Sequence, residues 1–492
     1  MTRQLPVLPA DCISEILEHL DKDICTLHSC LLVDRLWCKI SVKILWRDVW
    51  NCKYYCYQRS ILSTLVACLP KESKELLHER EIFISTPTPK PPSFSYEKFC
   101  KVLPIYKMCI KIENVLNYEL PPTFNIKERN FLVINEIIKM YTNQIYSLKK
   151  LTYYNYKEYR DFSFTCFPGV RSLSELGCSS NLPSDFFNQM SQICQNLQSI
   201  SIRFNSVEVS NDLKELISLQ NNLKHLTLTA FFDASWKDII PSLTKHLKTI
   251  TKLYLYSDKD NLSLSFVSSF SNLQEIMFSF YNEADFKDLQ YAHFPRLQIL
   301  KIPYRCYHYS VYKHIMKFLE TNGSNLKKFH THEHDPMLSL SIPRFCTNLR
   351  SLFIILKSGE LNTLANIFTS CQYLESIGIW CGCVYLSEEK VLEIVADHAP
   401  TNFCELKIYN ISNSEFVTPE DLELFFMKWN NRTPKKLFSL IVYKSNYNSH
   451  SLLNERSMKV IKKYERLGVT KLAIKMYRED AEEEEIRMEE IS

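Results

Sequence analysis

The sequence predicts an α/β fold in which a short helical module is followed by a curved solenoid of strand-helix repeats. From Leu148 onward one apolar motif recurs at steps of 22 to 34 residues, with helical patterns between its copies. The first fifty residues lack this motif and carry apolar side chains at helical spacing instead. The hydrophobic content of 46% and the charged content of 23% are close to globular averages, so a disordered chain is excluded.

Residues 1–50 are expected to form three helices. Asp11 is suited to cap the first helix and Asp23 the second, and the third carries Trp37. The apolar positions of the first helix, at helical spacing, are Ile13, Ile16, Leu17 and Leu20. A domain below ~50 residues is marginally stable alone, and these helices hold more apolar side chains than such a bundle can cover. The surplus predicts a partner surface.

Four short stretches of this module follow one another in the order of a known motif. They are LPADCISEIL at 8–17, LDKD at 20–23, CLLVDRLW at 30–37 and LWR at 45–47. Together they resemble the F-box, which implies docking to a Skp-family adaptor and, through it, to the cullin of an SCF-type ubiquitin ligase. Adaptor contacts are then expected at Leu8, Pro9, Ile16, Leu17, Leu31 and Trp37, with Trp37 as the main anchor. The alternative is that these helices only cap the repeats.

Residues 51–147 are expected to link this F-box domain to the repeats. Four prolines lie within 85–94, which predicts a stiff, extended loop. Apolar spacing predicts helices over 61–69 and 130–145. The solenoid is expected over 148–477.

The recurring motif reads apolar-x-x-apolar-x-apolar, and its steps fall in or near the roughly 20–29-residue period of leucine-rich repeats. Cysteine lies three residues before the first apolar position at Cys194, Cys346 and Cys371. This pattern resembles the cysteine-containing leucine-rich repeats of F-box proteins, so the chain resembles the fungal-type F-box/leucine-rich-repeat family. The copies begin at Leu148, Val170 (degenerate), Leu197, Leu223, Ile250, Leu273, Leu297, Leu326, Leu349, Leu374, Phe403, Leu437 and Val469.

One face of the predicted strands offers a binding surface. Because side chains alternate along a strand, the residues beside the buried positions point to the other face, which is the concave surface of a solenoid. Tyr, Trp and Arg dominate interface energetics, although a tyrosine-rich composition explains the same residues equally well. The candidate target-binding residues are Tyr154, Arg203, Tyr254, Tyr256, Trp380, Tyr409 and Tyr443.

A histidine cluster is a candidate metal site. His330 and His332 share one face of a predicted strand with His334, so three imidazoles could meet a metal ion. The favoured interpretation is a polar patch at the end of one repeat. The cysteines form no C-x-x-C, so neither metal nor cofactor is expected. No catalytic residues are predicted.

Composition excludes several classes of function. Seven glycines in 492 residues form no glycine-rich phosphate-binding motif, which disfavours Rossmann and P-loop enzymes. The net charge is +4, and the Lys and Arg residues form no dense block in the sequence, so no nucleic-acid partner is expected. No apolar run approaches the ~18 residues of a membrane span. The absence of a signal-peptide pattern predicts a cytoplasmic or nuclear chain with reduced cysteines.

The favoured function is therefore the substrate-recognition subunit of an SCF-type ubiquitin ligase, without catalysis of its own. Its target protein is not identified by the sequence. The alternatives are an interaction scaffold that acts outside proteolysis and a metal-dependent enzyme that uses the histidines. The last segment, residues 478–492, holds eight acidic and two basic residues and is too charged to form a core.

Overall fold

The computed structural model divides by its contacts into two compact units. The first comprises residues 1–202 and 208–223, and the second comprises 203–207 and 224–492. No helix among the described residues is long and apolar enough to cross a membrane. The structure describes residues 8–21, 23–52, 54–87, 92–120, 125–154, 167–205, 208–231, 234–257, 264–280, 286–302, 309–332, 334–410, 417–444 and 454–476. The acidic tail and residues 88–91 of the proline-rich loop lie outside these described residues.

The first unit begins with the three helices that the sequence predicts, α1 (Ala10–Glu18), α2 (Ile24–Cys30) and α3 (Arg35–Leu45). The Asp34 carboxylate caps α3 by accepting hydrogen bonds from the backbone N–H groups of Leu36 and Trp37, at 2.7 and 2.9 Å. Asp23 caps α2 as expected, accepting from the Thr26 N–H at 3.0 Å. The buried core of the bundle consists of Ile13, Leu17, Leu27, Cys30 and Ile44.

The start of α1 differs from the expectation. Pro9, rather than Asp11, holds the N-cap position, and Asp11 lies in the first helical turn. Proline fixes its own φ and leaves the preceding residue extended, so the helix starts directly after it. Asp11 still favours the helix, because a negative charge near the N-terminus complements the helix dipole.

The remainder of the first unit contains helices and the first strands. Its helical segments are η1 (Val49–Asn51), α4 (Tyr55–Cys68), α5 (Lys71–Glu79), η2 (Tyr96–Phe99), α6 (Ile105–Glu119), α7 (Ile126–Gln144), η4 (Pro168–Ser172), α8 (Ser184–Ile193) and α9 (Asn211–Leu219). Its strands are β1 (Val102–Pro104), β2 (Lys150–Tyr153) and β3 (Glu175–Ser179), and β4 (Ser199–Phe204) begins in it. Helices α4 and α7 cover most of the two helices predicted in the linker.

Two strands differ from the expected repeats. β1 lies in the segment expected to be a linker, and it pairs in parallel with β2, Leu103 opposite Leu151. The buried residues Cys100, Leu103 and Ile105, in and directly beside β1, have the spacing of the motif, and this spacing is the sequence signal for the strand. The sequence pattern places the degenerate copy at Val170, which is three residues too early. Leu151 is the second apolar position of its own copy, and in the parallel ladder its neighbour on β3 is Leu176. The motif of β3 therefore starts at Leu173.

Helix α3 is joined to β1 by several contacts within the first unit. The backbone N–H groups of Lys101 and Val102 both donate to the Arg47 carbonyl, at 2.8 and 3.1 Å. The Arg47 side chain makes a two-point ion pair with Glu18 of α1. Trp46 packs on Tyr96, with 4.4 Å between the ring centroids. The three-helix bundle and the first strand are thus one connected structure.

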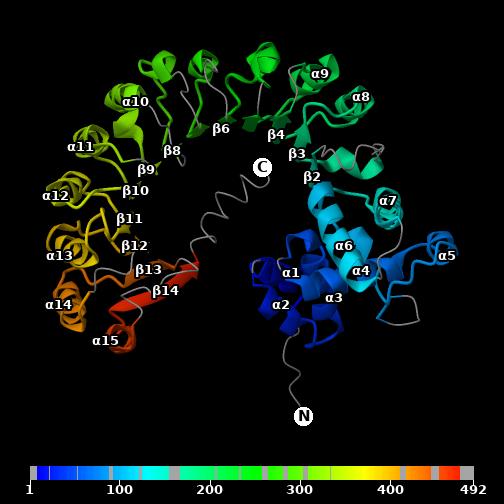
Figure 1. Cartoon of the computed structure of the whole chain (residues 1–492), viewed down its shortest axis with the longest axis horizontal. Helices are drawn as coiled ribbons and strands as arrows, with labels where there is room; N and C mark the ends of the chain where they lie inside the picture. The colour runs from blue at the N-terminus through cyan, green and yellow to red at the C-terminus, as the bar shows by residue number, and fades with distance from the viewer. Residues whose placement is uncertain are drawn as a thin grey trace. The chain divides into compact units, whose positions relative to one another are not determined.

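The second unit repeats a parallel strand followed by a helix. Figure 1 shows strands β8–β14 side by side with helices α10–α15 along one face. The strands are β5 (His225–Ala230), β6 (Lys252–Ser257), β7 (Glu275–Phe280), β8 (Ile299–Ile302), β9 (Lys328–Thr331), β10 (Ser351–Ile354), β11 (Ser376–Cys381), β12 (Glu405–Asn410), β13 (Phe438–Lys444) and β14 (Thr470–Met476). The helical segments are η5 (Lys237–His246), η6 (Ser265–Ser269), η7 (Phe286–Leu289), α10 (Tyr309–Asn322), η8 (Gly323–Asn325), α11 (Pro336–Phe345), α12 (Leu361–Ser370), α13 (Glu388–His398), α14 (Pro419–Asn430) and α15 (Glu455–Arg466).

The motif positions form the core between strands and helices. The second and third apolar positions are Ile377 and Ile379 in β11 and Leu406 and Ile408 in β12, and all four are fully buried. They lie opposite one another in parallel register. The predicted leucine-rich-repeat solenoid is therefore confirmed as an α/β fold with three helices at its start.

The cysteines before the motif are free thiols, and two of them hydrogen-bond the preceding repeat. The Cys194 thiol donates to the Val170 carbonyl at 3.1 Å, and the Cys371 thiol donates to the Cys346 carbonyl at 3.4 Å. Gln220 takes the same place one repeat later, donating to the Cys194 carbonyl at 2.8 Å. Burial raises the pKa of the Cys371 thiol to about 12. These thiols therefore serve packing rather than redox chemistry.

Candidate functional site

The surface of the α1–α3 bundle carries large apolar side chains that the bundle does not cover. The exposed ones are Leu8, Ile16, Ile24, Leu32 and Val33, of which Leu32 is 88% exposed. Leu31, Leu32 and Val33 follow one another at the end of α2, where a single helix cannot turn three successive side chains inward. Three apolar residues in succession are therefore the sequence signal that Leu32 and Val33 are exposed. The predicted set of adaptor contacts omits both residues.

The six predicted adaptor contacts fall into three groups. Leu8, Pro9 and Ile16 are exposed and open to a partner. Leu31 and Trp37 are half-buried, and Trp37 packs against the bundle core. Leu17 is 0% exposed, so it holds the bundle together from inside and does not face a partner in this conformation.

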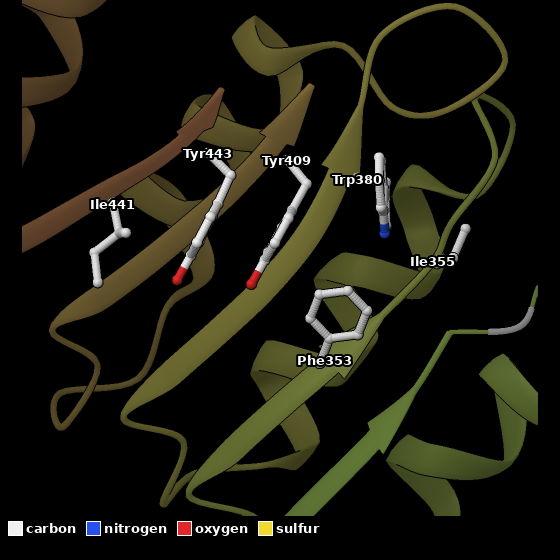
Figure 2. Packing of buried hydrophobic residues seen from close by; sticks show 6 residues of the cluster. All are labelled: Phe353, Ile355, Trp380, Tyr409, Ile441 and Tyr443. Atoms are coloured by element: carbon white, nitrogen blue, oxygen red, sulfur yellow. The ribbon is translucent and has the colours of Figure 1, made fainter. Parts of the chain in front are cut away.

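A second feature is an aromatic cluster on the helix-free face of strands β10–β13. Figure 2 shows its members lying over neighbouring strands: Phe353, Ile355, Trp380, Tyr409, Ile441 and Tyr443. Tyr409 and Tyr443 stack in parallel with 4.1 Å between ring centroids. Trp380 lies 5.6 Å from Tyr409, and Phe353 meets the same ring edge-on at 5.1 Å. All six side chains are buried.

Gly378 makes room for this cluster. It lies opposite Phe353 in the parallel ladder between β10 and β11. A Cβ atom at position 378 would stand 2.7 Å from the Phe353 ring, well inside van der Waals contact. Glycine is therefore required here by the close approach of an aromatic ring, rather than by a turn.

Two imidazole rings continue the aromatic cluster onto β9 and the residue after it. His330 stacks on Phe353 at 4.3 Å, and His332 stacks on the same ring at 4.5 Å. Burial, with neighbouring cations including Lys301 and Lys328, holds the pKa of His330 well below its usual range. Burial also lowers the pKa of His332 to about 4. Both imidazoles are therefore neutral at physiological pH.

The structure does not gather the three histidines into one site. His334 turns away and pairs with the Glu360 carboxylate, 2.6 Å from its Nε2 atom. Within the described residues, no group of three or more His, Cys, Asp or Glu side chains could hold a metal ion. His330 and His332 thus pack on Phe353, whereas the sequence predicts an exposed polar patch there.

Neutral buried histidines make the second unit sensitive to acid. The pKa of an unfolded histidine is about 6.5, so protons bind the unfolded chain more readily as the pH falls from 6.5 towards 4. The stability that the neutral rings contribute is fully present above pH 6.5 and is lost progressively as the pH falls through that window, with a slope of up to ~1.4 kcal/mol per pH unit for each histidine. His332→Phe keeps a ring on Phe353 and should make the loss shallower.

Urea unfolding at several pH values measures this slope. His398→Phe is the control, because His398 is exposed on α13 and outside the cluster. Equal pH slopes for the wild type and His332→Phe would contradict the prediction.

The remaining predicted target-binding residues lie apart from the cluster. Tyr154 is buried in the first unit, its hydroxyl 3.4 Å from that of Ser201. Arg203 is buried with its guanidinium 5.7 Å from the Phe231 ring, and half-buried Tyr256 packs on that ring at 5.5 Å.

Tyr254 belongs to a charged group on β6–β8. It is half-buried and hydrogen-bonds the Glu275 carboxylate. Lys301 and Lys252 lie 3.3 and 3.5 Å from the same carboxylate and help to lower its pKa. The structure thus brings Trp380, Tyr409 and Tyr443 together and distributes the other predicted residues among separate groups.

No protein-family model matches the sequence, and no curated protein matches it. Solved structures resemble the fold. A leucine-rich repeat-containing protein, LegL7 from Legionella pneumophila, shares 12% identity at a TM-score of 0.35, over 52% of this chain and 90% of the other. A chain in the complex of Rad7 and Elc1 in yeast shares 12% identity at a TM-score of 0.40, over 97% of this chain and 100% of the other. Likenesses this distant assign no function to the chain.

Proposed function

We propose that this chain is the target-binding subunit of an SCF-type ubiquitin ligase, in which the α1–α3 bundle binds a Skp-family adaptor. The observation that carries the proposal is the apolar surface of that bundle. Leu8, Ile16, Ile24, Leu32 and Val33 are exposed on a three-helix module whose sequence resembles the F-box. Exposed apolar patches of this kind mark protein interaction sites, and the resemblance supplies the adaptor as the partner.

The connection between the bundle and the repeats supports the same role. Arg47 links α3 both to α1, through Glu18, and to β1, through its carbonyl. One chain would therefore carry both the adaptor contact and the target. Ubiquitin transfer would gain from collecting the target and the other subunits in one complex, because holding reactants together lowers the entropic part of the barrier. The chain would bind the target, and other subunits would carry out the chemistry.

The target surface is proposed on the solenoid's helix-free face. Tyr254 and Tyr256 are half-buried there, so part of each ring can meet a partner. The second candidate function is a scaffold that uses the same adaptor contact without leading to degradation, in the cytoplasm or the nucleus.

Co-purification of the adaptor and cullin with the full chain tests the proposal. Leu8→Ala with Pro9→Ala removes exposed contacts that precede or begin α1, so the bundle should stay folded. Truncating interface anchors commonly costs ~2–4 kcal/mol, or roughly thirty- to thousand-fold in affinity. The double variant should therefore lose adaptor and cullin but keep any protein that the solenoid binds, and that protein should accumulate in cells.

The matched control replaces Leu424 and Met427 with alanine, two residues exposed on α14. Circular dichroism checks that both variants keep their helices. A wild-type chain that captures no adaptor would remove the ligase proposal altogether. Adaptor capture without target accumulation in the double variant would favour the scaffold.

A further inference from the structure

The last strand of the solenoid exposes apolar side chains at positions that are buried in the strand before it. Leu440 and Val442 of β13 are fully buried, and their parallel neighbours on β14 are Leu472 and Ile474. Leu472 is only half-buried, and Ile474 is 47% exposed. β14 is also the last strand in the sheet order, so one of its edges has no strand beside it among the described residues.

This end of the solenoid is strongly basic. Residues 454–476, which form α15 and β14, contain seven Lys or Arg and two Glu, a net charge of +5. Lys463 faces backward and pairs with Glu423 of α14. Lys462, Arg466 and Lys471 are exposed and make no ion pair among the described residues. The open end therefore combines uncovered apolar side chains with uncompensated positive charge.

We propose that residues 478–492 of the same chain bind this open end and cap the solenoid. The segment starts two residues after β14 and carries a net charge of −6, close to the opposite of the charge on α15 and β14. It also contains Ile486, Met488 and Ile491, which can cover Leu472 and Ile474. Repeat arrays need a polar cap at each end, and open strand edges otherwise invite association between chains.

The tether makes the chain's own segment the favoured occupant. A binding segment joined by a short flexible link acts at an effective concentration of about a millimolar. An acidic segment from another protein would have to exceed that concentration or bind more tightly. The inference is independent of the adaptor, because it concerns the far end of the repeats.

Hydrogen exchange in the full chain and in a chain lacking residues 478–492 is the first test. Capping predicts that amides of α15 and β14 exchange roughly tenfold faster without the segment, because local opening becomes easier. A second variant with Glu482, Glu483, Glu484 and Glu485 all changed to Gln keeps the length and should show the same acceleration. Unchanged exchange in both variants would overturn the proposal.

Binding in trans is the second test. A labelled peptide of residues 478–492 should bind the shortened chain, and should bind the full chain at least roughly tenfold more weakly because the tethered copy competes. Lys462→Glu with Arg466→Glu should weaken binding to the shortened chain roughly tenfold, and added salt should weaken it too. The control, Lys224→Glu with Lys237→Glu, reverses two lysines exposed on earlier repeats and should have no effect.

Equal peptide binding to the full and shortened chains would refute capping in cis. Light scattering of the full chain tests the other occupant, a second copy. A full-length dimer that Ile474→Glu converts to a monomer would assign the open edge to self-association and overturn the proposal.

Discussion

Leu17→Ala and Ile16→Ala are expected to reduce adaptor binding for different reasons, although the two residues are neighbours on α1. Leu17 is fully buried in the bundle core, so its truncation should destabilise α1–α3 by about 2–5 kcal/mol. The free energy of unfolding of a bundle this small is low, so the change should unfold it. Adaptor binding would then be lost together with the fold.

Ile16→Ala should leave the bundle folded and weaken adaptor binding. Ile16 is 47% exposed, so its truncation removes little from the core. An apolar contact at the centre of an interface is worth about 2 kcal/mol when truncated, which is roughly thirtyfold in affinity. Thermal unfolding and calorimetric titration with the adaptor separate the two variants.

The comparison has a clear contrary outcome. If Ile16→Ala bound the adaptor as tightly as the wild type while remaining folded, α1 would not contact the adaptor through this residue. If Leu17→Ala stayed folded and lost only binding, α1 would have to move in the complex and expose Leu17.

Tyr409→Ala should strongly destabilise the second unit. Its ring contacts Phe353, Trp380 and Tyr443 and is buried, so alanine would leave a cavity among three aromatic rings. Truncation of a buried aromatic side chain costs about 3–5 kcal/mol. The midpoint of urea unfolding should fall accordingly.

Tyr373→Ala is the matched control, since Tyr373 is 55% exposed. It should change the stability by no more than about 0.5 kcal/mol, as surface substitutions usually do. A small effect of Tyr409→Ala, together with loss of a bound protein, would show that Tyr409 serves recognition and not packing.

Much of the fold was predictable because the signals are local and repeated. The spacing of Ile13 and Leu17 predicts α1, and the C-x-x-L-x-x-L-x-[LI] pattern predicts most strands with their buried positions. Alternation along a strand also assigns Tyr409 and Tyr443 to the helix-free face. The sequence does not predict β1, because Cys100, Leu103 and Ile105 lie between helical segments and beside Pro104. A single copy of the motif in such a segment cannot be distinguished from chance spacing.

The candidate site was less predictable, because exposure depends on neighbouring elements. Sequence patterns place Leu17 and Ile16 on the same helix, but only the packing of α2 and α3 decides that Leu17 is covered. Likewise, nothing local distinguishes Tyr254 from Tyr409. The register of β10–β13 brings Phe353, Trp380 and Tyr443 against Tyr409 and buries it.

The residue pattern is sufficient to predict the helical start, the repeat length and the buried positions of most strands. These follow from side-chain periodicity, which acts over a few residues. Which apolar residues stay uncovered, such as Leu32 after α2 and Ile474 on β14, depends on the packing of neighbouring elements and is visible only in the folded structure. Ile474 has the same motif position as the fully buried Val442, and it is exposed because no described repeat follows to cover it.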